Sequence, residues 1–82
     1  MEYQEKFKFL KIEQMKRKDK EEYFFVIHLL DKQNNPCRFF IFNKDLMKKV
    51  STMKFAGLQD LNIIYRVAYS NNNWQVTLLD IN

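Results

Sequence analysis

The chain has 82 residues, which is enough for one small domain and no more, so we expect a single domain over residues 1–82. Its 14 Lys and Arg against 10 Asp and Glu give a net charge of +4, and the high aromatic content of 16% leaves rings for a surface as well as a core. The single cysteine, Cys37, excludes an intramolecular disulfide and a multi-cysteine metal site.

From the sequence we expect neither a membrane-spanning segment nor a secretion signal. No apolar run approaches the roughly 18 residues that a spanning helix needs. Residues 1–6 lack the basic-then-apolar pattern of a secretion signal. A lone cysteine also fits a reducing compartment. We therefore expect a cytoplasmic protein without a membrane partner.

Residues 5–15 alternate at first, with Phe7 and Phe9 on one side and lysines on the other. This alternation has the period of a β-strand. Leu10 and Ile12 then fall on the lysine side, so we expect a strongly bent strand whose buried face changes along its length. An amphipathic helix is the alternative for this segment.

Residues 16–22 form a charged connection that contains Lys16, Arg17, Lys18 and Lys20. A charge run of this kind is most simply a solvated turn. Its functional interpretation is a flexible basic loop that contacts phosphates.

Residues 23–42 contain two runs rich in β-branched and aromatic residues on either side of a polar break at residues 31–36, which predicts a β-hairpin. When Leu30 is placed opposite Cys37, one face of this hairpin carries Phe25, Ile27, Leu29, Arg38, Phe40 and Phe42. The other face carries Phe24, Val26, His28, Leu30, Cys37, Phe39 and Ile41, of which we expect Phe24 and Phe39 to be core. A slip of one residue would exchange the partners.

Residues 43–56 have the period of a short helix. Its apolar positions share one face: Leu46, Met47, Val50 and Met53. Asn43 suits the N-cap, and Gly57, the only glycine, is expected to end the helix in the left-handed conformation.

The last third of the chain predicts a second hairpin, with strands on either side of a turn at residues 70–73. The turn contains three asparagines, and asparagine tolerates the left-handed conformation that tight turns need. Tyr69 and Trp74 flank it.

The predicted order is strand, strand, strand, helix, strand, strand. This all-β chain with one helix has the element order of the five-stranded OB-fold barrel, and closure into a barrel would protect the sheet edges. OB barrels usually bend their first strand at glycines, and none precedes Gly57 here. An SH3-like barrel and a helix packed on an open antiparallel sheet are the alternatives.

The central hairpin resembles a known family. Leu29-Leu30-Asp31, a polar turn, Arg38 and then Phe42-Asn43 are similar to the second and third strands of the single-strand-binding OB domains of replication protein A, although Asn34-Asn35 replaces the glycine typical of that turn. The resemblance implies that Arg38 contacts the nucleic-acid backbone and that Phe42 stacks on a base. It also implies a second stacking ring near the last turn, at Tyr69 or Trp74.

The charge distribution agrees with a nucleic-acid partner. Residues 16–54 hold ten Lys and Arg against five Asp and Glu, and single strands bind to a positive groove with aromatic faces. The expected nucleic-acid-binding residues are Arg38, Phe40, Phe42, Phe25, Trp74, Tyr69, Lys16, Arg17, Lys18 and Lys20. Phe40 and Phe42 fit the core equally well. The expected ligand is single-stranded DNA or RNA, with DNA preferred, and the expected setting is a homo-oligomer or a replication or recombination assembly.

The sequence offers no pattern for catalysis. It has no nucleophile–base spacing, no glycine-rich phosphate loop and no paired carboxylates in an apolar setting. His28 has no second histidine or cysteine on its face, so we expect a partly buried, hydrogen-bonded side chain rather than a metal ligand. We therefore expect neither enzyme activity, cofactor nor metal. The alternative function is a protein-interaction module, such as a small phage-like accessory protein or inhibitor that docks through exposed aromatics or a strand edge.

Overall fold

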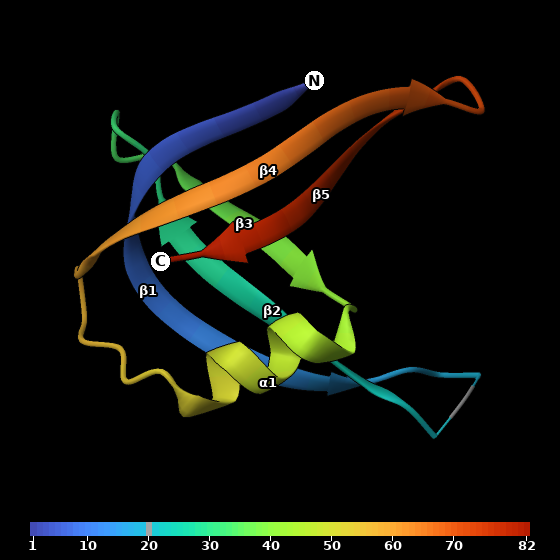
Figure 1. Cartoon of the computed structure of the whole chain (residues 1–82), viewed down its shortest axis with the longest axis horizontal. Coiled ribbons are helices and arrows are strands. Elements are labelled where there is room, and N and C mark those ends of the chain that lie inside the picture. The colour runs from blue at the N-terminus through green and yellow to red at the C-terminus, as the bar shows by residue number, and fades with distance from the viewer. Residues whose placement is uncertain (20) are drawn as a thin grey trace.

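The computed structural model describes residues 1–19 and 21–82, so the predicted contact residue Lys20 lies outside the described residues. The described chain follows the predicted order of five strands and one helix (Figure 1). The elements are β1 (Glu2–Lys16), β2 (Tyr23–Leu30), β3 (Pro36–Ile41), α1 (Lys44–Thr52), β4 (Asp60–Ser70) and β5 (Asn73–Ile81). The helical alternative for residues 5–15 is therefore wrong.

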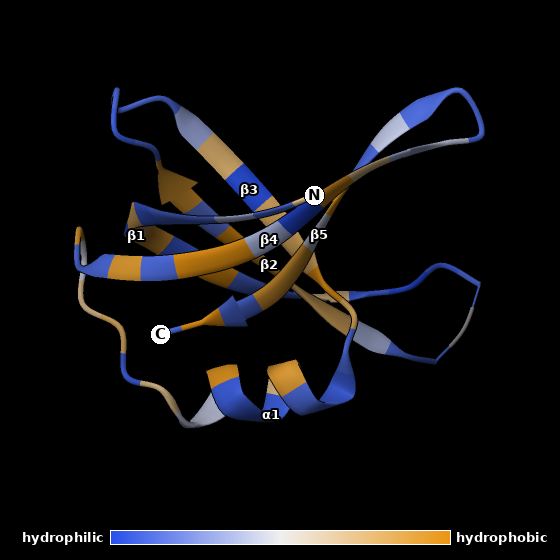
Figure 2. Ribbon diagram, turned by 45° about the horizontal axis from the view of Figure 1, so that its top comes forward, coloured by the Kyte–Doolittle hydropathy of each residue, from blue (hydrophilic) through white to orange (hydrophobic). Residues whose placement is uncertain are grey.

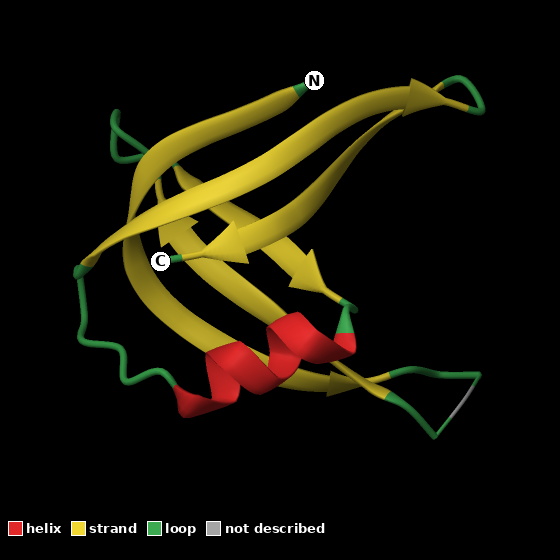
Figure 3. Cartoon of the chain, viewed as in Figure 1, coloured by secondary structure: helices red, strands yellow, loops and turns green. Residues whose placement is uncertain are grey.

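The strands form one antiparallel sheet in the order β3-β2-β1-β4-β5. The long β1 holds the sheet together because residues 2–8 pair with β4 and residues 8–16 pair with β2, and the strand bends between the two (Figure 3). The edge strands β3 and β5 approach within 8 Å between Cα atoms. They are not hydrogen-bonded neighbours, so the sheet of the described chain is not closed.

A β-bulge keeps β1 facing the core on one side throughout. Phe7 and Phe9 are buried, the pairing with β2 shifts between Phe9 and Lys11, and Ile12 then packs against the same core. The expected change of buried face is therefore wrong: the extra residue of the bulge, Leu10, resets the alternation by one position. The exposed fraction of Leu10 is 39%.

The β2–β3 hairpin has a register one residue away from the expected one. Leu29 lies opposite Cys37 and His28 opposite Arg38, and Leu30 is paired with Pro36. The physical reason is the loop, in which the Asp31 carboxylate accepts hydrogen bonds from the backbone N–H groups of residues 33 and 35 at 2.9 and 2.8 Å. This Asx-type loop is completed before Pro36, so β3 begins one residue earlier than expected.

The corrected register exchanges the two faces of β3. Cys37, Phe39 and Ile41 join Phe25, Ile27 and Leu29 on the core side. Arg38 and Phe40 join Phe24, Val26 and His28 on the outer side. The core consists of the buried side chains of all five strands and the helix: Phe7, Phe9, Ile27, Leu29, Phe39, Ile41, Leu46, Val50, Leu61, Ile63, Leu78 and Ile81.

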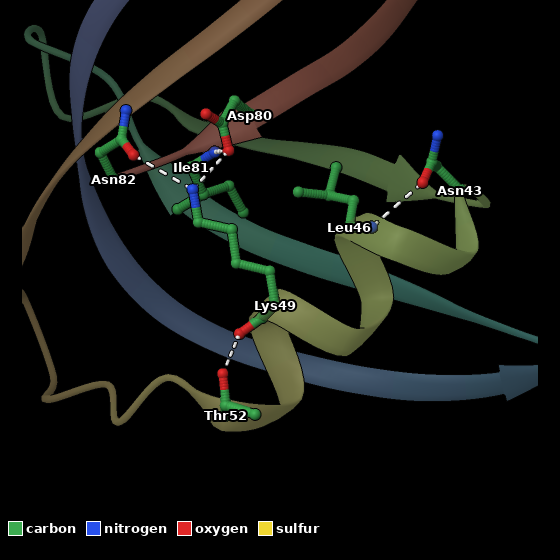
Figure 4. A network of polar contacts seen from close by, with 7 residues as sticks. All are labelled: Asn43, Leu46, Lys49, Thr52, Asp80, Ile81 and Asn82. Carbon is green, nitrogen blue, oxygen red and sulfur yellow. Dashed lines mark hydrogen bonds and ion pairs between the residues drawn. The ribbon is translucent and has the colours of Figure 1, made fainter.

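The helix begins as predicted and ends earlier. The Asn43 side chain accepts a hydrogen bond from the Leu46 backbone N–H at 3.1 Å, which confirms the N-cap. The helix ends at Thr52, whose hydroxyl donates to the Lys49 carbonyl at 2.8 Å (Figure 4). Gly57 does not end it and has no positive φ; Leu58 adopts φ 62° instead.

The apolar side of α1 faces the sheet (Figure 2), and one polar contact fixes the helix to β5. The Lys49 Nζ donates to the Asp80 carboxylate at 2.7 Å and to the Asn82 side-chain carbonyl at 3.1 Å (Figure 4). Asp80 also accepts from the Ile81 backbone N–H at 2.9 Å. The Lys49 hydrogen bond, followed by that of Ile81, lowers the pKa of Asp80 although partial burial opposes it.

The β4–β5 hairpin has the predicted turn, with Asn71 and Asn72 at φ 50° and 63°. Two consecutive left-handed residues are the geometry of a tight hairpin turn. An irregularity in the pairing at residues 64–65 shifts the alternation of β5, so that Leu78 and Ile81 are both buried. In the described part of the chain, no helix is long and apolar enough to cross a membrane.

We predict that Asp80→Asn destabilises the protein at neutral pH and makes its stability less dependent on acid. A carboxyl with a lowered pKa stabilises the fold above its unfolded pKa of about 3.9, and this contribution disappears as the pH falls through the lower folded value. Because the side chains of Lys49 and Asp80 are 42% and 39% exposed, solvent screening limits the loss in unfolding free energy to about 0.5 kcal/mol. Thermal unfolding followed by circular dichroism between neutral and acidic pH measures both effects.

Lys49→Gln should reproduce the loss, and Lys48→Gln on the exposed side of α1 serves as the matched control. Equal stability of Asp80→Asn and the parent chain at neutral pH would show that this contact contributes nothing to holding the helix.

Candidate functional site

Three phenylalanine rings gather on the outer face of the β2–β3 hairpin. The centroid of Phe24 lies 6.1 Å from that of Phe40 and 5.0 Å from that of Phe42, and the last two rings are stacked at 6.3 Å. Phe40 and Phe42 are 45% and 56% exposed. We call these three residues the phenylalanine cluster. The sequence allowed Phe40 and Phe42 to be either surface or core residues, and in the structure both lie on the surface.

Each end of the phenylalanine cluster carries an arginine. The guanidinium carbon of Arg38 lies 5.5 Å from the Phe40 ring centroid, and that of Arg17 lies 5.8 Å from the Phe42 centroid. Both distances are within the range of cation–π attraction. Two guanidinium groups are thus held against the rings that they flank.

Arg17 is also bound by acidic side chains of its own loop. Its guanidinium lies 3.6 Å from the Glu22 carboxylate and 3.9 Å from that of Asp19. The backbone N–H of Arg17 donates to the Glu22 carbonyl at 2.9 Å. These contacts fix the base of the β1–β2 connection beside the cluster.

The phenylalanine cluster borders two open grooves. The first has a volume of about 430 Å³ and is lined by Met15, Lys16, Arg17, Lys18, Asp19, Phe24, Phe40 and Phe42. The second has a volume of about 310 Å³ and is lined by Gln14, Arg17, Glu22, Tyr23, Phe25, Phe42, Lys44 and Met47. Arg17 and Phe42 line both grooves, so the two grooves meet at this pair.

The opposite end of the same sheet face is polar. The His28 Nε2 lies 2.7 Å from the Glu13 carboxylate, and the Lys11 Nζ lies 3.3 Å from the same oxygen. Hydrogen bonding by Lys11, and then by His28, lowers the pKa of Glu13. The expectation of a partly buried, hydrogen-bonded histidine is confirmed. Val26, opposite Phe40, is buried between this polar end and the rings.

The structure brings most of the predicted hairpin and loop residues together around these grooves: Arg38, Phe40, Phe42, Lys16, Arg17 and Lys18. Lys16 is the last residue of β1 rather than part of the connection. The expectation for Phe25 on the Arg38 face is wrong, because the corrected register turns it to the core side. Phe24 takes its place on the outer face and is not core. Phe24, Val26 and His28 are spaced by two residues and so share one strand face. Once the loop length is known, this spacing places Phe24 on the same face as Arg38 and Phe40.

The predicted aromatic pair of the last hairpin lies apart from this cluster. Tyr69 and Trp74 are cross-strand partners whose rings meet edge to face at 5.1 Å. They are 58% and 73% exposed. Among the described residues, no ring–ring contact joins this pair to the phenylalanine cluster.

In the described part of the chain, neither the Cys37 thiol nor a cluster of titratable side chains forms a reactive centre. Cys37 lies on the core side, and burial, followed by the charges of Asp31 and Glu5, raises the pKa of its thiol. A raised pKa leaves less thiolate and therefore low reactivity. Within residues 1–19 and 21–82, no group of three or more His, Cys, Asp or Glu side chains has the arrangement of a metal site.

We predict that Phe39→Ala and Phe40→Ala differ sharply in stability, although the two residues are neighbours. Phe39 is 8% exposed and Phe40 is 45% exposed. Removing a buried phenylalanine costs about 3–5 kcal/mol, whereas truncation of the exposed ring should cost about 1 kcal/mol or less. Urea unfolding at constant pH measures both variants. A larger loss for Phe40→Ala would contradict the register of the β2–β3 hairpin.

Comparison of the chain with protein-family models, curated proteins and solved structures found no match. A function must therefore be inferred from the arrangement of the site itself. Exposed rings with flat faces, bordered by guanidinium and ammonium groups, suit a ligand that is both planar and anionic.

Proposed function

We propose that the chain is a small basic OB-fold protein that binds single-stranded nucleic acid with little sequence preference. The observation that carries the proposal is the phenylalanine cluster, exposed on the outer sheet face and flanked by the guanidinium groups of Arg17 and Arg38. Stacking supplies affinity that is tolerant of sequence because every base has a flat face. DNA is the first polymer to test.

The strand order supports an OB-fold as the architecture behind the site. The order β3-β2-β1-β4-β5, with the helix between β3 and β4, is the connectivity of that barrel. The two edge strands approach each other, as a nearly closed barrel requires. The end of β1 and the β4–β5 turn also extend toward the same end of the sheet (Figures 1 and 2). Loops at these positions rim the ligand groove in OB proteins.

The spacing of the outward side chains along the β3 segment supports stacking of successive bases. Side chains on one face of a strand repeat about every 6.6 Å. Arg38, Phe40 and Phe42 are spaced in this way, so one cation and two rings lie along a line. An extended strand that follows this line would meet a cation for its backbone and rings for its bases, each ring worth about 1–3 kcal/mol.

The first groove supplies the electrostatic part of binding. Lys16, Arg17 and Lys18 line it next to the rings, with Asp19 as its only acidic side chain among the described residues. Arg17 would exchange its contacts with Asp19 and Glu22 for a phosphate. Because such contacts release counterions, the affinity is expected to fall with salt.

The small extent of the cluster implies weak binding by one copy. Three rings and a few cations span only a few nucleotides, so we propose that the domain acts as a homo-oligomer or beside a replication or recombination protein. Linked sites gain avidity without new contacts.

We predict that Phe42→Ala weakens binding of a labelled oligothymidine by about five- to 100-fold, which corresponds to the loss of about 1–3 kcal/mol of stacking. Tyr3→Ala, an exposed ring that stacks on Tyr65 at a distance from the cluster, is the matched control and should retain the parent affinity. Fluorescence anisotropy at fixed salt measures both, with duplex DNA of the same length as a weaker ligand. Equal affinities of Phe42→Ala and the parent chain would reject the stacking site.

We predict that Arg38→Ala lowers both the affinity and its dependence on salt. Loss of one phosphate contact should reduce the slope of log affinity against log salt by about 0.7 for a single strand. Lys48→Ala on α1 removes the same charge at a distance from the cluster and controls for net charge. Titrations at several salt concentrations test this. An unchanged slope in Arg38→Ala would place this side chain away from the phosphates.

A further inference from the structure

A second surface lies where the two sheet edges approach each other. An open groove of about 340 Å³ is lined by residues of β1, β3, β4 and β5 and of the loop before β3: Glu5, Phe7, Asp31, Cys37, Arg38, Phe39, Tyr65 and Val76. We call it the seam groove. Apart from Arg38 and Asp31, it is formed by core-side positions of the strands, whereas the phenylalanine cluster is on the outer face.

The floor of the seam groove is aromatic. Phe7, Phe39 and Tyr65 lie in mutual contact, with ring centroids 5.5 to 6.4 Å apart. Tyr3 stacks on Tyr65 at 5.4 Å. Phe7 and Phe39 are buried beneath the groove, whereas Tyr65 is partly exposed and Tyr3 is 40% exposed, so the tyrosines bring this aromatic group to the surface.

The core-side face continues from this floor along the projecting β4–β5 hairpin. Val76 lies opposite Val67 and Trp74 opposite Tyr69, and each pair follows Tyr65 at intervals of two residues along β4. Val76, Trp74 and Tyr69 are more than half exposed. Adjacent exposed apolar side chains of this kind are a feature of interaction sites.

The backbone beside this strip is unpaired on one side. Within the described residues, β5 has a hydrogen-bonded neighbour only in β4, and residues 73–77 are exposed without exception. A free strand edge next to an apolar face offers main-chain hydrogen bonds and side-chain contacts to a further strand. The occupant that satisfies both is an extended peptide.

The charge of the seam groove differs from that of the phenylalanine cluster. Glu5 and Asp31 line the groove against a single cation, Arg38. Burial is the main cause that raises the pKa of Tyr65, and the negative charge of Glu5 is the next. Burial also raises the pKa of Cys37, followed by the negative charges of Asp31 and Glu5. The potential inside the groove is therefore negative, which disfavours phosphates and favours ammonium or guanidinium groups.

We propose that the seam groove and the free edge of β5 dock an extended, basic segment of a partner protein, which adds as a strand to β5. Lysine or arginine side chains of that segment lie between the carboxylates of the groove and the rings of Tyr65 and Trp74. Cation–π contact with tyrosine and tryptophan then adds to the pairing of charges. The seam groove shares Arg38 with the proposed nucleic-acid site but not its rings, and the peptide proposal does not depend on nucleic-acid binding.

Two capped peptides of equal length test the proposal, one of alternating lysine and valine and one of alternating glutamate and valine. Both have the same strand pattern and differ in charge alone. Backbone amide NMR shifts of the uniformly labelled protein should report binding of the lysine peptide at residues 73–77 and Tyr65, with an affinity at least about tenfold above that of the glutamate peptide. Equal affinities, shifts confined to the phenylalanine cluster, or no shift at about 1 mM peptide would overturn it.

Two variants locate the contact. Glu5→Gln should weaken the lysine peptide severalfold, and Trp74→Ser should do the same, while thermal unfolding remains close to that of the parent because both side chains are exposed. Phe40→Ala, on the other surface, should bind the peptide with unchanged affinity. Unchanged affinity in Glu5→Gln and Trp74→Ser would overturn the assignment.

Two competing occupants have their own signatures in the same experiments. A second copy of the chain on this surface would give a concentration-dependent dimer in sedimentation that the lysine peptide fails to dissociate. A nucleic acid on this surface would make oligothymidine shift the amides of residues 73–77. Either result would overturn the peptide proposal.

Discussion

The loop closed by Asp31 decides which side chains the molecule presents to solvent. Its carboxylate accepts two backbone hydrogen bonds within the loop, and this arrangement begins β3 at Pro36. Because strand side chains alternate, one residue more or less in this loop would place Arg38 and Phe40 in the core and Cys37 and Phe39 in water. The candidate site therefore depends on a short polar loop that contributes no side chain to the phenylalanine cluster.

The sequence pattern predicted the elements and their order well, because strand alternation, the Asn43 cap and the Asn71-Asn72 turn are local signals. It failed where an extra residue changes the alternation. The bulge after Phe9 appears in the sequence as the shift of apolar residues to Leu10 and Ile12, but Leu10 is as apolar as its buried neighbours, so the pattern does not show that one residue is extra. Arg38 and Phe42 lie at the phenylalanine cluster, as the sequence pattern predicts, whereas the exchange of Phe25 for Phe24 follows from the register alone.

The end of the helix is a second feature that the sequence pattern does not predict correctly. Gly57 is the only residue of the chain with free access to left-handed backbone, yet the left-handed residue after α1 is Leu58. The helix ends where Ser51 and Thr52 hydroxyls donate to carbonyls of the preceding turn, at 2.8 Å each. Local side-chain hydrogen bonds of this kind compete with helix continuation. Such competition depends on packing around the turn, which a propensity argument does not contain.

The two exposed surfaces follow from how an 82-residue sheet divides its aromatic residues. Phe7, Phe9 and Phe39 fill the core, whereas the phenylalanine cluster and the Tyr69–Trp74 pair remain in water. Rings in water add little to folding stability and raise the risk of aggregation, so polar residues would serve the fold as well at those positions. The sequence nevertheless places cations beside one set of rings and carboxylates beside the continuation of the other. This division of charge is the feature on which both proposed ligands, one anionic and one cationic, depend.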